Sequence, residues 1–335
     1  MFKVLSLLPE PRFTSAGVKI PDKLQVEFLT NYAPEAIIEA AKGKDGLFVP
    51  PSHPRLTAEI LEKLTDIKMI QSAGAGFDSV DHQAAAKLGL AVCNSPAQNA
   101  TTVAEFVLSA IISLQRETAY ADAHIKAGHY SEVRERILQR GCLEIFGSTV
   151  GIVGFGAIGR ALVPYLKAFG ANIVAQDVYW NEEFAKEHGV RRVELDDLFY
   201  VSDVITLHCP LMDSTRGLVD AARLAMMKPN AVLVNAARGG IVIEKDLAEA
   251  LEKGIIRGAA IDNFESEIPD SQNPLLNLSP GASRNVLFTP HLAGVTLAAF
   301  SRMLRQGMAN MADSLSGASA PRFSINGVST IRGNA

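Results

Sequence analysis

Three glycines in the middle of the chain have the spacing of a phosphate-binding turn. Gly154, Gly156 and Gly159 stand between an apolar run, residues 149–153, and an amphipathic segment, residues 160–169. In such a strand–turn–helix unit the first glycine allows a tight turn, the second lets the backbone approach a phosphate, and the third lets the helix pack closely on the strand. Because helix N-terminal amides also favour negative charge, the spacing predicts a site for the pyrophosphate of a dinucleotide.

A carboxylate after the next strand-like run indicates which dinucleotide is bound. Asp177 follows residues 172–176, and no arginine follows it until Arg191. A carboxylate there can accept both hydrogen bonds of an adenosine ribose diol and would repel a 2′-phosphate. We therefore predict NAD rather than NADP, with the amides of Ala157 and Ile158 beside the pyrophosphate. The alternative is a structural glycine turn with a surface aspartate.

Three charged or titratable side chains follow other strand-like runs. Arg238 comes after residues 232–237, and His291 comes after residues 286–288, with Glu267 in a loop between them. Ligands of an open parallel sheet bind beyond the carboxyl ends of its strands. Hydride transfer from a secondary alcohol to a nicotinamide needs a base for the hydroxyl proton and a cation for the developing oxyanion.

Each of these residues fits one role in that reaction. We expect His291 to be the acid/base, Glu267 to stabilise its imidazolium form, and Arg238 to bind the substrate carboxylate and polarise the carbonyl. Taken singly, an arginine or a histidine in a loop is more often structural. The acidic residues of segment 262–270 could instead form a metal site or a solvated loop, but we predict no metal because the arginine already supplies positive charge.

The expected elements divide into two α/β units. Strand-like runs at 3–8, 46–49, 68–72 and 90–94, with helical segments at 58–64 and 81–88, predict a smaller first unit. The later runs, at 204–208, 231–236, 255–261 and 286–288, are mostly continuous apolar stretches, which are typical of a parallel sheet covered on both faces. We therefore expect an α/β protein whose second unit is a Rossmann-type doubly wound sheet.

Two long helices are expected in addition. Thr101 to about Ala127 predicts one helix, and residues 297 to about 315 predict another that returns to the first unit. The earlier helix has an apolar face broad enough to pack on a core or on a second subunit. This face consists of Val103, Phe106, Val107, Ala110, Ile111 and Leu114.

Composition is that of a soluble enzyme. The 335 residues are 48% hydrophobic and 20% charged, with a net charge of −4, which excludes disorder and gives no basic field for nucleic acid or anionic membrane. The N-terminal apolar run is too short for a signal peptide, and no run is long enough to span a membrane. Cys93, Cys142 and Cys209 are widely spaced, so we expect reduced thiols in a cytoplasmic protein.

Nearly the whole chain resembles an NAD-dependent D-isomer-specific 2-hydroxyacid dehydrogenase, of the kind that includes phosphoglycerate dehydrogenases and glycerate or glyoxylate–hydroxypyruvate reductases. The matching motifs occur in the family's order. They are residues 72–81, residues 99–105, the glycine motif with Asp177, residues 235–240, residues 262–267 and residues 289–291.

The resemblance implies a division of labour between two domains. Residues 1–100 and 296–335 would form a discontinuous, flavodoxin-like substrate domain, and residues 101–295 the NAD-binding Rossmann domain. Asp262 would contact the nicotinamide amide, and Arg238, Glu267 and His291 would hold the catalytic roles given above. The resemblance also implies a homodimer.

The resemblance assigns further residues to each site. The substrate carboxylate would be held by Ser72, Ala73, Gly74, Ala75, Gly76 and Asn99. The cofactor would be bound by Gly154, Gly156, Ala157, Ile158, Gly159, Asp177, Cys209, Pro210, Ala236, Arg238, Asp262 and His291.

Two departures from the family pattern bear on the substrate. Asn263 replaces a valine, and Ile268 separates Glu267 from the following proline, so the loop around the acid could be set differently. Phosphoglycerate-specific relatives tend to carry basic residues where this chain has segment 50–55, Pro-Pro-Ser-His-Pro-Arg. Small acids such as glyoxylate, hydroxypyruvate or glycerate are therefore at least as well supported. An NAD-sensing corepressor, and a phosphite or formate dehydrogenase, are the alternatives on the same fold.

Overall fold

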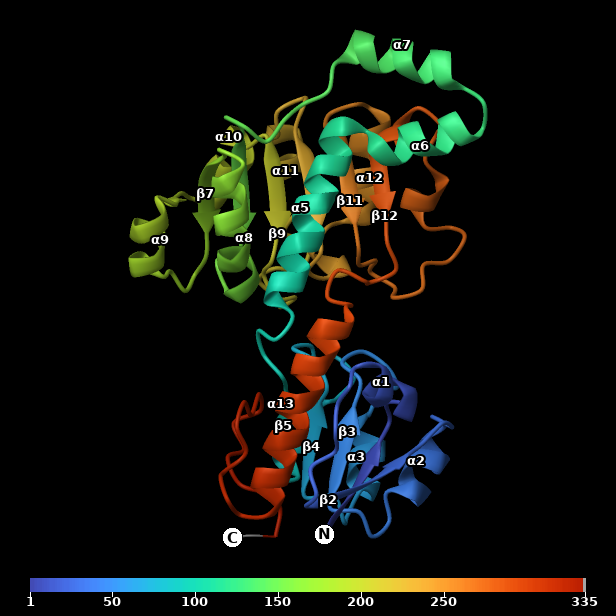
Figure 1. Ribbon diagram of the computed structural model, residues 1–335, viewed down its shortest axis with the longest axis vertical. Coiled ribbons are helices and arrows are strands. Elements are labelled where there is room, and N and C mark those ends of the chain that lie inside the picture. The colour runs from blue at the N-terminus through green and yellow to red at the C-terminus, as the bar shows by residue number, and fades with distance from the viewer. Residues whose placement is uncertain (334–335) are drawn as a thin grey trace. The chain divides into compact units, whose positions relative to one another are not determined.

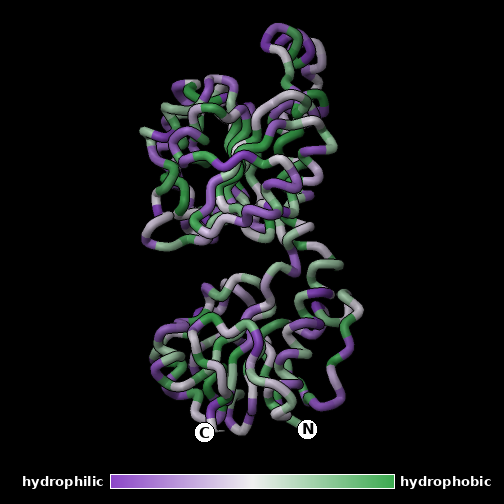
Figure 2. The backbone as a smooth tube through the Cα atoms, turned by 90° about the vertical axis from the view of Figure 1, so that its left-hand side faces the viewer, coloured by the Kyte–Doolittle hydropathy of each residue, from purple (hydrophilic) through white to green (hydrophobic). Residues whose placement is uncertain are grey.

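The computed structural model describes residues 1–333, which form two compact units (Figure 1). Unit 1 consists of residues 1–99 together with residues 295–333, and unit 2 consists of residues 100–294. Within each unit, hydrophobic segments gather at the centre and hydrophilic ones lie toward the outside (Figure 2). Each unit therefore has a core of its own.

Unit 1 is built on a five-stranded parallel sheet in the order β2-β1-β3-β4-β5, which is the flavodoxin-like order. Its strands are β1 (Phe2–Ser6), β2 (Leu24–Phe28), β3 (Gly46–Val49), β4 (Met69–Ser72) and β5 (Ala91–Cys93). Its helices are α1 (Glu10–Ser15), α2 (Pro34–Ala40), α3 (Ala58–Lys63), α4 (His82–Lys87) and α13 (Leu297–Leu315). Strand β2 was not among the predicted strands; it is an edge strand in which exposed residues alternate with the buried Leu24 and two half-buried residues.

Two glycines let the last helix lie close to this sheet. A Cβ on Gly46 of β3 would come within 2.4 Å of Met311 Cε, and a Cβ on Gly307 of α13 would come within 2.9 Å of the Phe48 ring. The helix begins at Leu297 because Thr296 caps it, accepting a hydrogen bond from the Ala299 amide at Oγ1. Helix α13 thus completes the core of unit 1 although it is remote in sequence.

Unit 2 is built on a seven-stranded parallel sheet in the order β12-β11-β10-β9-β6-β7-β8. Its strands are β6 (Thr149–Val153), β7 (Asn172–Gln176), β8 (Arg191–Arg192), β9 (Val204–Leu207), β10 (Val232–Asn235), β11 (Gly258–Ile261) and β12 (Val286–Phe288). The order reverses at β6, which is the topological switch point of a Rossmann sheet. The prediction of a doubly wound sheet with a smaller flavodoxin-like unit is therefore confirmed.

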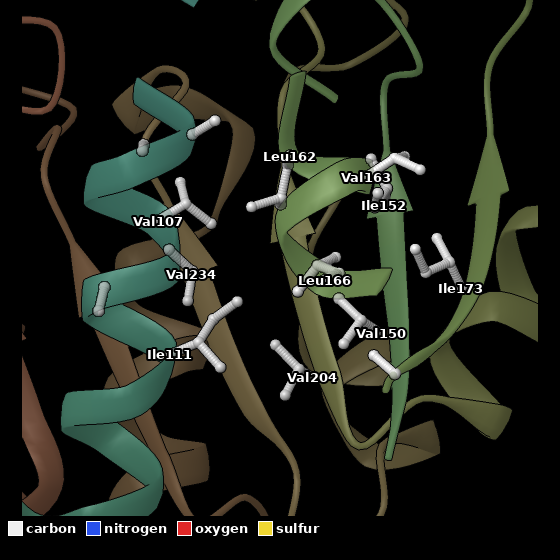
Figure 3. Close-up of a cluster of buried hydrophobic side chains, with 14 of the residues drawn as sticks. Val107, Ile111, Val150, Ile152, Leu162, Val163, Leu166, Ile173, Val204 and Val234 are labelled. Atoms are coloured by element: carbon white, nitrogen blue, oxygen red, sulfur yellow. The ribbon is translucent and has the colours of Figure 1, made fainter. Parts of the chain in front are cut away.

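Most helices of unit 2 cover its sheet, whereas α7 (Tyr130–Arg140) projects away from it (Figure 1). The other helices are α5 (Ala100–Arg116), α6 (Thr118–Lys126), α8 (Ala157–Ala168), α9 (Glu182–His188), α10 (Leu195–Val201), α11 (Ala221–Met226) and α12 (Glu244–Glu252). Short 3-10 turns occur at η1 (Gly239–Ile241), η2 (Pro274–Asn277) and η3 (Ala282–Asn285). In Figure 3, side chains of α5 and α8 pack on those of the central strands, with Val107 and Ile111 opposite Leu162 and Val204. The apolar face of α5 is therefore part of the unit's own core.

The helix predicted from Thr101 to about Ala127 is in fact broken. It ends at Arg116, because Glu117 adopts a left-handed conformation with φ of 53°, and α6 begins at Thr118. The side chain of Glu117 is 1% exposed, and it pairs with Arg136 of α7 and with Arg257 at 3.2 Å. This ion pairing turns the chain away from the line of α5, an effect that helical periodicity cannot reveal.

Candidate active site

The glycine turn between β6 and α8 has three different steric environments. Gly154 has φ of 97°, and a Cβ there would lie 2.6 Å from the Cys209 nitrogen. A Cβ on Gly159 would lie 2.4 Å from the Gly154 carbonyl oxygen. At Gly156, by contrast, a Cβ would meet no atom within 4 Å. The first and third glycines are thus required by packing, while the second borders open space that a ligand can enter.

The open side of this turn fits a dinucleotide pyrophosphate. Helix α8 begins at Ala157, so the amides of Ala157 and Ile158 have no carbonyl acceptor within the helix and are left to bind a ligand. The turn is also tied to Asp177, whose Oδ2 accepts a hydrogen bond from the Phe155 amide at 2.6 Å and whose Oδ1 accepts one from Tyr179 at 2.8 Å. Two structural bonds therefore fix the carboxylate at the end of β7, next to the turn.

The segment after β9 forms another wall of the same turn. Cys209 adjoins Gly154, and Pro210 follows it at the surface. Burial, together with the negative charge of Asp177, raises the pKa of the Cys209 thiol to about 11, so the thiol is protonated at neutral pH. Ala236, the remaining small residue predicted to contact the cofactor, lies buried at the end of β10.

Arg238 is positioned by the end of β10 and by the next loop. The side chain of Asn235 accepts a hydrogen bond from the Ala237 amide at 3.1 Å and donates to the Arg238 carbonyl at 2.9 Å. A Cβ on Gly239 would overlap the Phe264 carbonyl group at 2.0 Å, so the loops after β10 and β11 are in direct contact. Asn235 was predicted only as part of a motif, with no role of its own, although an asparagine before a tight turn is a known signal for such bonding.

His291 and Glu267 form a direct pair. His291 Nδ1 lies 2.8 Å from Glu267 Oε1, and their side chains are 36% and 55% exposed. His291 itself has φ of 53°, a conformation held by hydrogen bonds from its amide to the carbonyls of Asp262 and Thr289. Because Nδ1 faces the carboxylate, Nε2 is the ring nitrogen left for a substrate.

Asp262 organises the segment that carries His291. The residue is 2% exposed, and its carboxylate accepts hydrogen bonds from Thr289 Oγ1 at 2.6 Å, from the Leu292 amide at 2.8 Å and from the Ala293 amide at 3.0 Å. Both oxygens are thus engaged within the loop. The contact with a nicotinamide amide that the resemblance implies would have to use a lone pair not taken by these donors.

The two departures from the family pattern have different structural consequences. Ile268 is 84% exposed, and the loop bends so that Ser266 Oγ donates to the Ile268 carbonyl at 2.9 Å, while Glu267 still reaches His291. Asn263 is 5% exposed, and within the part of the chain that the structure describes its side-chain amide has no hydrogen-bond partner. The inserted isoleucine is accommodated at the surface, whereas the asparagine buries polar atoms that have no hydrogen-bond partner among residues 1–333.

The predicted substrate residues belong to unit 1. Ser72 is the last residue of β4, Gly74 and Gly76 lie in the loop that follows, and Asn99 precedes α5. Arg238, Glu267, His291 and the glycine turn all belong to unit 2. Among residues 1–333, no group of three histidine, cysteine, aspartate or glutamate side chains could hold a metal ion. Over the same residues, no helix has both the length and the apolar character needed to cross a membrane.

Comparison with known proteins gives a family match. Residues 108–293 match the model of the family described as D-isomer specific 2-hydroxyacid dehydrogenase, NAD binding domain. The chain is 38% identical over 292 residues to D-3-phosphoglycerate dehydrogenase of Methanocaldococcus jannaschii, covering 87% of this chain and 53% of that protein. It therefore spans about half the length of this relative and of similar phosphoglycerate dehydrogenases.

Two further proteins match over most of their length. Glyoxylate reductase of Korarchaeum cryptofilum is 33% identical over 296 residues, covering 88% of this chain and 87% of that protein. The structure of D-lactate dehydrogenase from Aquifex aeolicus, complexed with NAD and lactic acid, superposes with a TM-score of 0.81 at 26% identity, covering 94% of this chain and 96% of that one.

A substitution at Gly156 tests the cofactor site without disturbing the fold. Gly156→Ala should leave stability unchanged, because the added Cβ meets nothing and the φ of −77° suits alanine. The same Cβ would obstruct a pyrophosphate, so the Kd for NADH should rise about tenfold or more, as a loss of close backbone approach predicts. Fluorescence titration with NADH measures this.

Gly281→Ala is the matched control for that variant. Gly281 also lies in unit 2, with φ of −70° and the nearest atom 3.7 Å from an added Cβ. It should change neither stability nor NADH affinity. Equal NADH affinity of the Gly156 and Gly281 variants would show that the open face of the turn does not meet the cofactor.

Proposed function

The chain belongs to the D-isomer specific 2-hydroxyacid dehydrogenase family, as its motifs indicated, and we propose that it interconverts a small D-2-hydroxy acid and the corresponding 2-oxo acid. The family model that it matches is that of an NAD-binding domain, and NAD is its cofactor. When bound, the nicotinamide ring would supply the chemistry of hydride transfer between the hydroxy acid and the oxo acid. The residues of this chain supply binding, orientation and proton transfer.

The pair of His291 and Glu267 is the observation that carries this proposal. Its 2.8 Å separation is that of a hydrogen bond between an imidazole and a carboxylate. Glu267 fixes the ring through Nδ1 and stabilises the imidazolium form, so Nε2 gives a proton to the substrate oxygen during reduction and takes it back during oxidation. The charge that develops on the substrate oxygen is offset by the guanidinium of Arg238, which also binds the carboxylate.

The cofactor roles follow from the glycine turn and its partners. The amides of Ala157 and Ile158 bind the pyrophosphate at the start of α8, and Asp177 accepts hydrogen bonds from the adenosine ribose. The charge on Asp177 disfavours a 2′-phosphate, so NAD is preferred over NADP. Asp262 holds the loop of His291 and, with its remaining lone pairs, contacts the nicotinamide amide.

The substrate we favour is an unphosphorylated acid of the glyoxylate or hydroxypyruvate type. Segment 50–55 follows β3 at the edge of the sheet where the loop of Gly74 also lies, and it carries a single arginine, Arg55. Pro51 packs against Gly74, its Cγ lying 3.4 Å from the position of an added Cβ. A phosphate dianion would require more fixed positive charge in this segment than one exposed arginine provides.

Reduction of a panel of 2-oxo acids with NADH tests the reaction and the substrate together. The panel contains glyoxylate, hydroxypyruvate, pyruvate and phosphohydroxypyruvate, and we expect the two small unphosphorylated acids named first to react best.

His291→Ala should lower kcat by roughly a hundredfold or more, the scale of a positioned acid/base. Glu267→Gln should lower kcat for reduction, because a neutral amide no longer stabilises the imidazolium form that transfers the proton.

NADH binding provides the control for both variants. Neither His291→Ala nor Glu267→Gln removes a group from the glycine turn, so their Kd for NADH should match that of the unmodified protein. A protein that binds NADH but reduces no member of the panel would support the corepressor alternative. A His291→Ala variant with near-normal kcat on the best acid would disprove the acid/base assignment.

Assembly as a homodimer through α7 is part of the proposal. Only Val133 of this helix is buried, and the helix projects away from the sheet (Figure 1), while the ion pair of Arg136 with Glu117 ties it to the end of α5. Tyr130, Arg134 and Leu138, one turn apart, line a shallow depression, and Tyr130 and Leu138 are 58% and 68% exposed. A tethered helix that exposes a tyrosine and a leucine among polar side chains suits a second copy of the chain.

The unpaired cysteines are consistent with the cytoplasm as the site of action.

Sedimentation equilibrium tests the assembly. The unmodified protein should sediment at twice the mass of the chain, and Leu138→Asp should shift it toward the monomer, because a carboxylate in an apolar contact is desolvated without a partner. Leu276→Asp, at a leucine that is 46% exposed on η2, is the control and should remain dimeric. Equal behaviour of the two variants would exclude α7 as the interface.

A further inference from the structure

The loop after β4 directs its carbonyl groups into the protein. The Ser72 carbonyl accepts a hydrogen bond from Gln71 Nε2 at 2.8 Å, and the Gly76 carbonyl accepts one from Ser72 Oγ at 2.6 Å. The Gly74 carbonyl accepts one from the Ser95 amide at 2.8 Å. The Ala75 carbonyl accepts one from Asn94 Nδ2 at 2.7 Å. Two of these four donors are neighbours in the segment that follows β5.

Fixing a carbonyl also fixes the amide of the next residue. The peptide unit is planar and trans, so its C=O and N–H groups point in opposite directions. The bond from Ser95 to the Gly74 carbonyl therefore turns the Ala75 amide outward, and the bond from Asn94 to the Ala75 carbonyl does the same for the Gly76 amide. Among residues 1–333, neither of these two amides donates to a protein acceptor, and both residues are partly exposed. Successive free amides form a site for an anion.

Asn94 is well placed to hold this arrangement. It is 9% exposed, and its own amide donates to the Phe323 carbonyl at 3.2 Å, which ties it to the C-terminal segment. Its side chain supplies the hydrogen bond to the Ala75 carbonyl, whereas the Gly74 carbonyl is held by a main-chain donor. A side-chain substitution at position 94 therefore removes one of the two orienting bonds and leaves the other.

We propose that Asn94 is a positioning residue for the substrate carboxylate, acting through the Ala75 carbonyl to keep the Gly76 amide turned toward the ligand. The inference rests on the proposed function, in which this loop binds the carboxylate of a 2-oxo acid. Asn94 does not touch the substrate. Its loss lets the peptide unit between Ala75 and Gly76 rotate, so the carboxylate loses a preorganised donor while the acid/base pair of unit 2 is unchanged.

Two substitutions separate orientation from charge. Asn94→Leu removes the donor without adding charge, and Asn94→Asp keeps the shape but replaces the donor by an acceptor. Both should raise KM for the best 2-oxo acid, and the Kd for oxamate in the presence of NADH, about tenfold, the effect of one lost hydrogen bond to a charged ligand site. The kcat, its pH profile and the Kd for NADH should change little, because His291 and the glycine turn belong to unit 2.

Asn326→Asp is the matched control. Asn326 lies in the C-terminal segment beside β5, where its Nδ2 donates to the Leu90 carbonyl at 2.9 Å and its Oδ1 accepts from the Val92 amide at 3.2 Å. The substitution removes the same kind of side-chain donor from the same edge of the sheet, without contact with the loop. It should lower the melting temperature about as much as the Asn94 variants but leave KM and oxamate binding unchanged.

Each outcome decides the inference. If the Asn94 and Asn326 variants bind oxamate equally well, or if only Asn94→Asp weakens it, Asn94 does not orient the loop. If the unmodified protein with NADH binds no oxamate, the loop is not a carboxylate site and the inference is wrong. If oxamate binds and depends on Asn94 but no 2-oxo acid is reduced, the inference stands and the proposed reaction fails.

Discussion

The buried carboxylate of Asp262 is the interaction on which the candidate active site most depends. A buried carboxyl group is unfavourable unless hydrogen-bond donors surround it, and Asp262, which is 2% exposed, receives them from the segment that follows β12. Three hydrogen bonds to its oxygens and one to its carbonyl bind residues 289–293 to the end of β11. The left-handed conformation of His291 is the result of this bonding, which sets the direction of the imidazole toward Glu267.

Close contacts at glycines set the remaining distances between the strand ends. Gly154 brings β6 against the segment after β9, Gly159 brings α8 against the turn, and Gly239 brings the loop of Arg238 against that of Glu267. In each case a methyl group would overlap backbone atoms, which cannot move aside as a flexible side chain can. The loops that carry cofactor and substrate residues are therefore held by main-chain packing, and Gly156 alone among the glycines of the turn faces open space.

Unit 1 reaches a comparable precision by hydrogen bonding. Asn310 of α13 donates to Gln71 Oε1 at 2.7 Å, and Gln71 in turn donates to the Ser72 carbonyl, so a buried polar chain extends from the last helix to the start of the substrate loop. Asn310 also bonds to both main-chain groups of Arg322. The C-terminal segment thus contributes to the shape of a loop far away in the sequence, which gives it a role beyond covering the edge of the sheet.

The amino-acid sequence was enough to predict the fold class, the family and the NAD cofactor, because these depend on local patterns. The patterns are apolar runs of strand length, the spacing of three glycines and short motifs around Asp177, Arg238 and His291. The sequence did not reveal that the helix after Thr101 breaks at Glu117, since the break is caused by Arg136 and Arg257, which are distant in sequence. Nor did it reveal the charge-rich α7, which has a single buried residue, or the edge strand β2.

Within the candidate site, the residue types were readable from the sequence, but their geometry was decided by tertiary structure. The fold of the loop around Phe264 and Gly239 decides two features that the sequence does not show. Ile268 leaves the contact between Glu267 and His291 intact, and Asn263 is buried without a partner among residues 1–333. The side chains of Asn94 and Asp262 bond to segments that are distant from them in the sequence, and the side chain of Asn235 ties the turn after β10 to the end of that strand. Sequence patterns specify elements because periodicity is local, whereas the orientation of a carbonyl or an imidazole depends on donors that only the folded chain brings near.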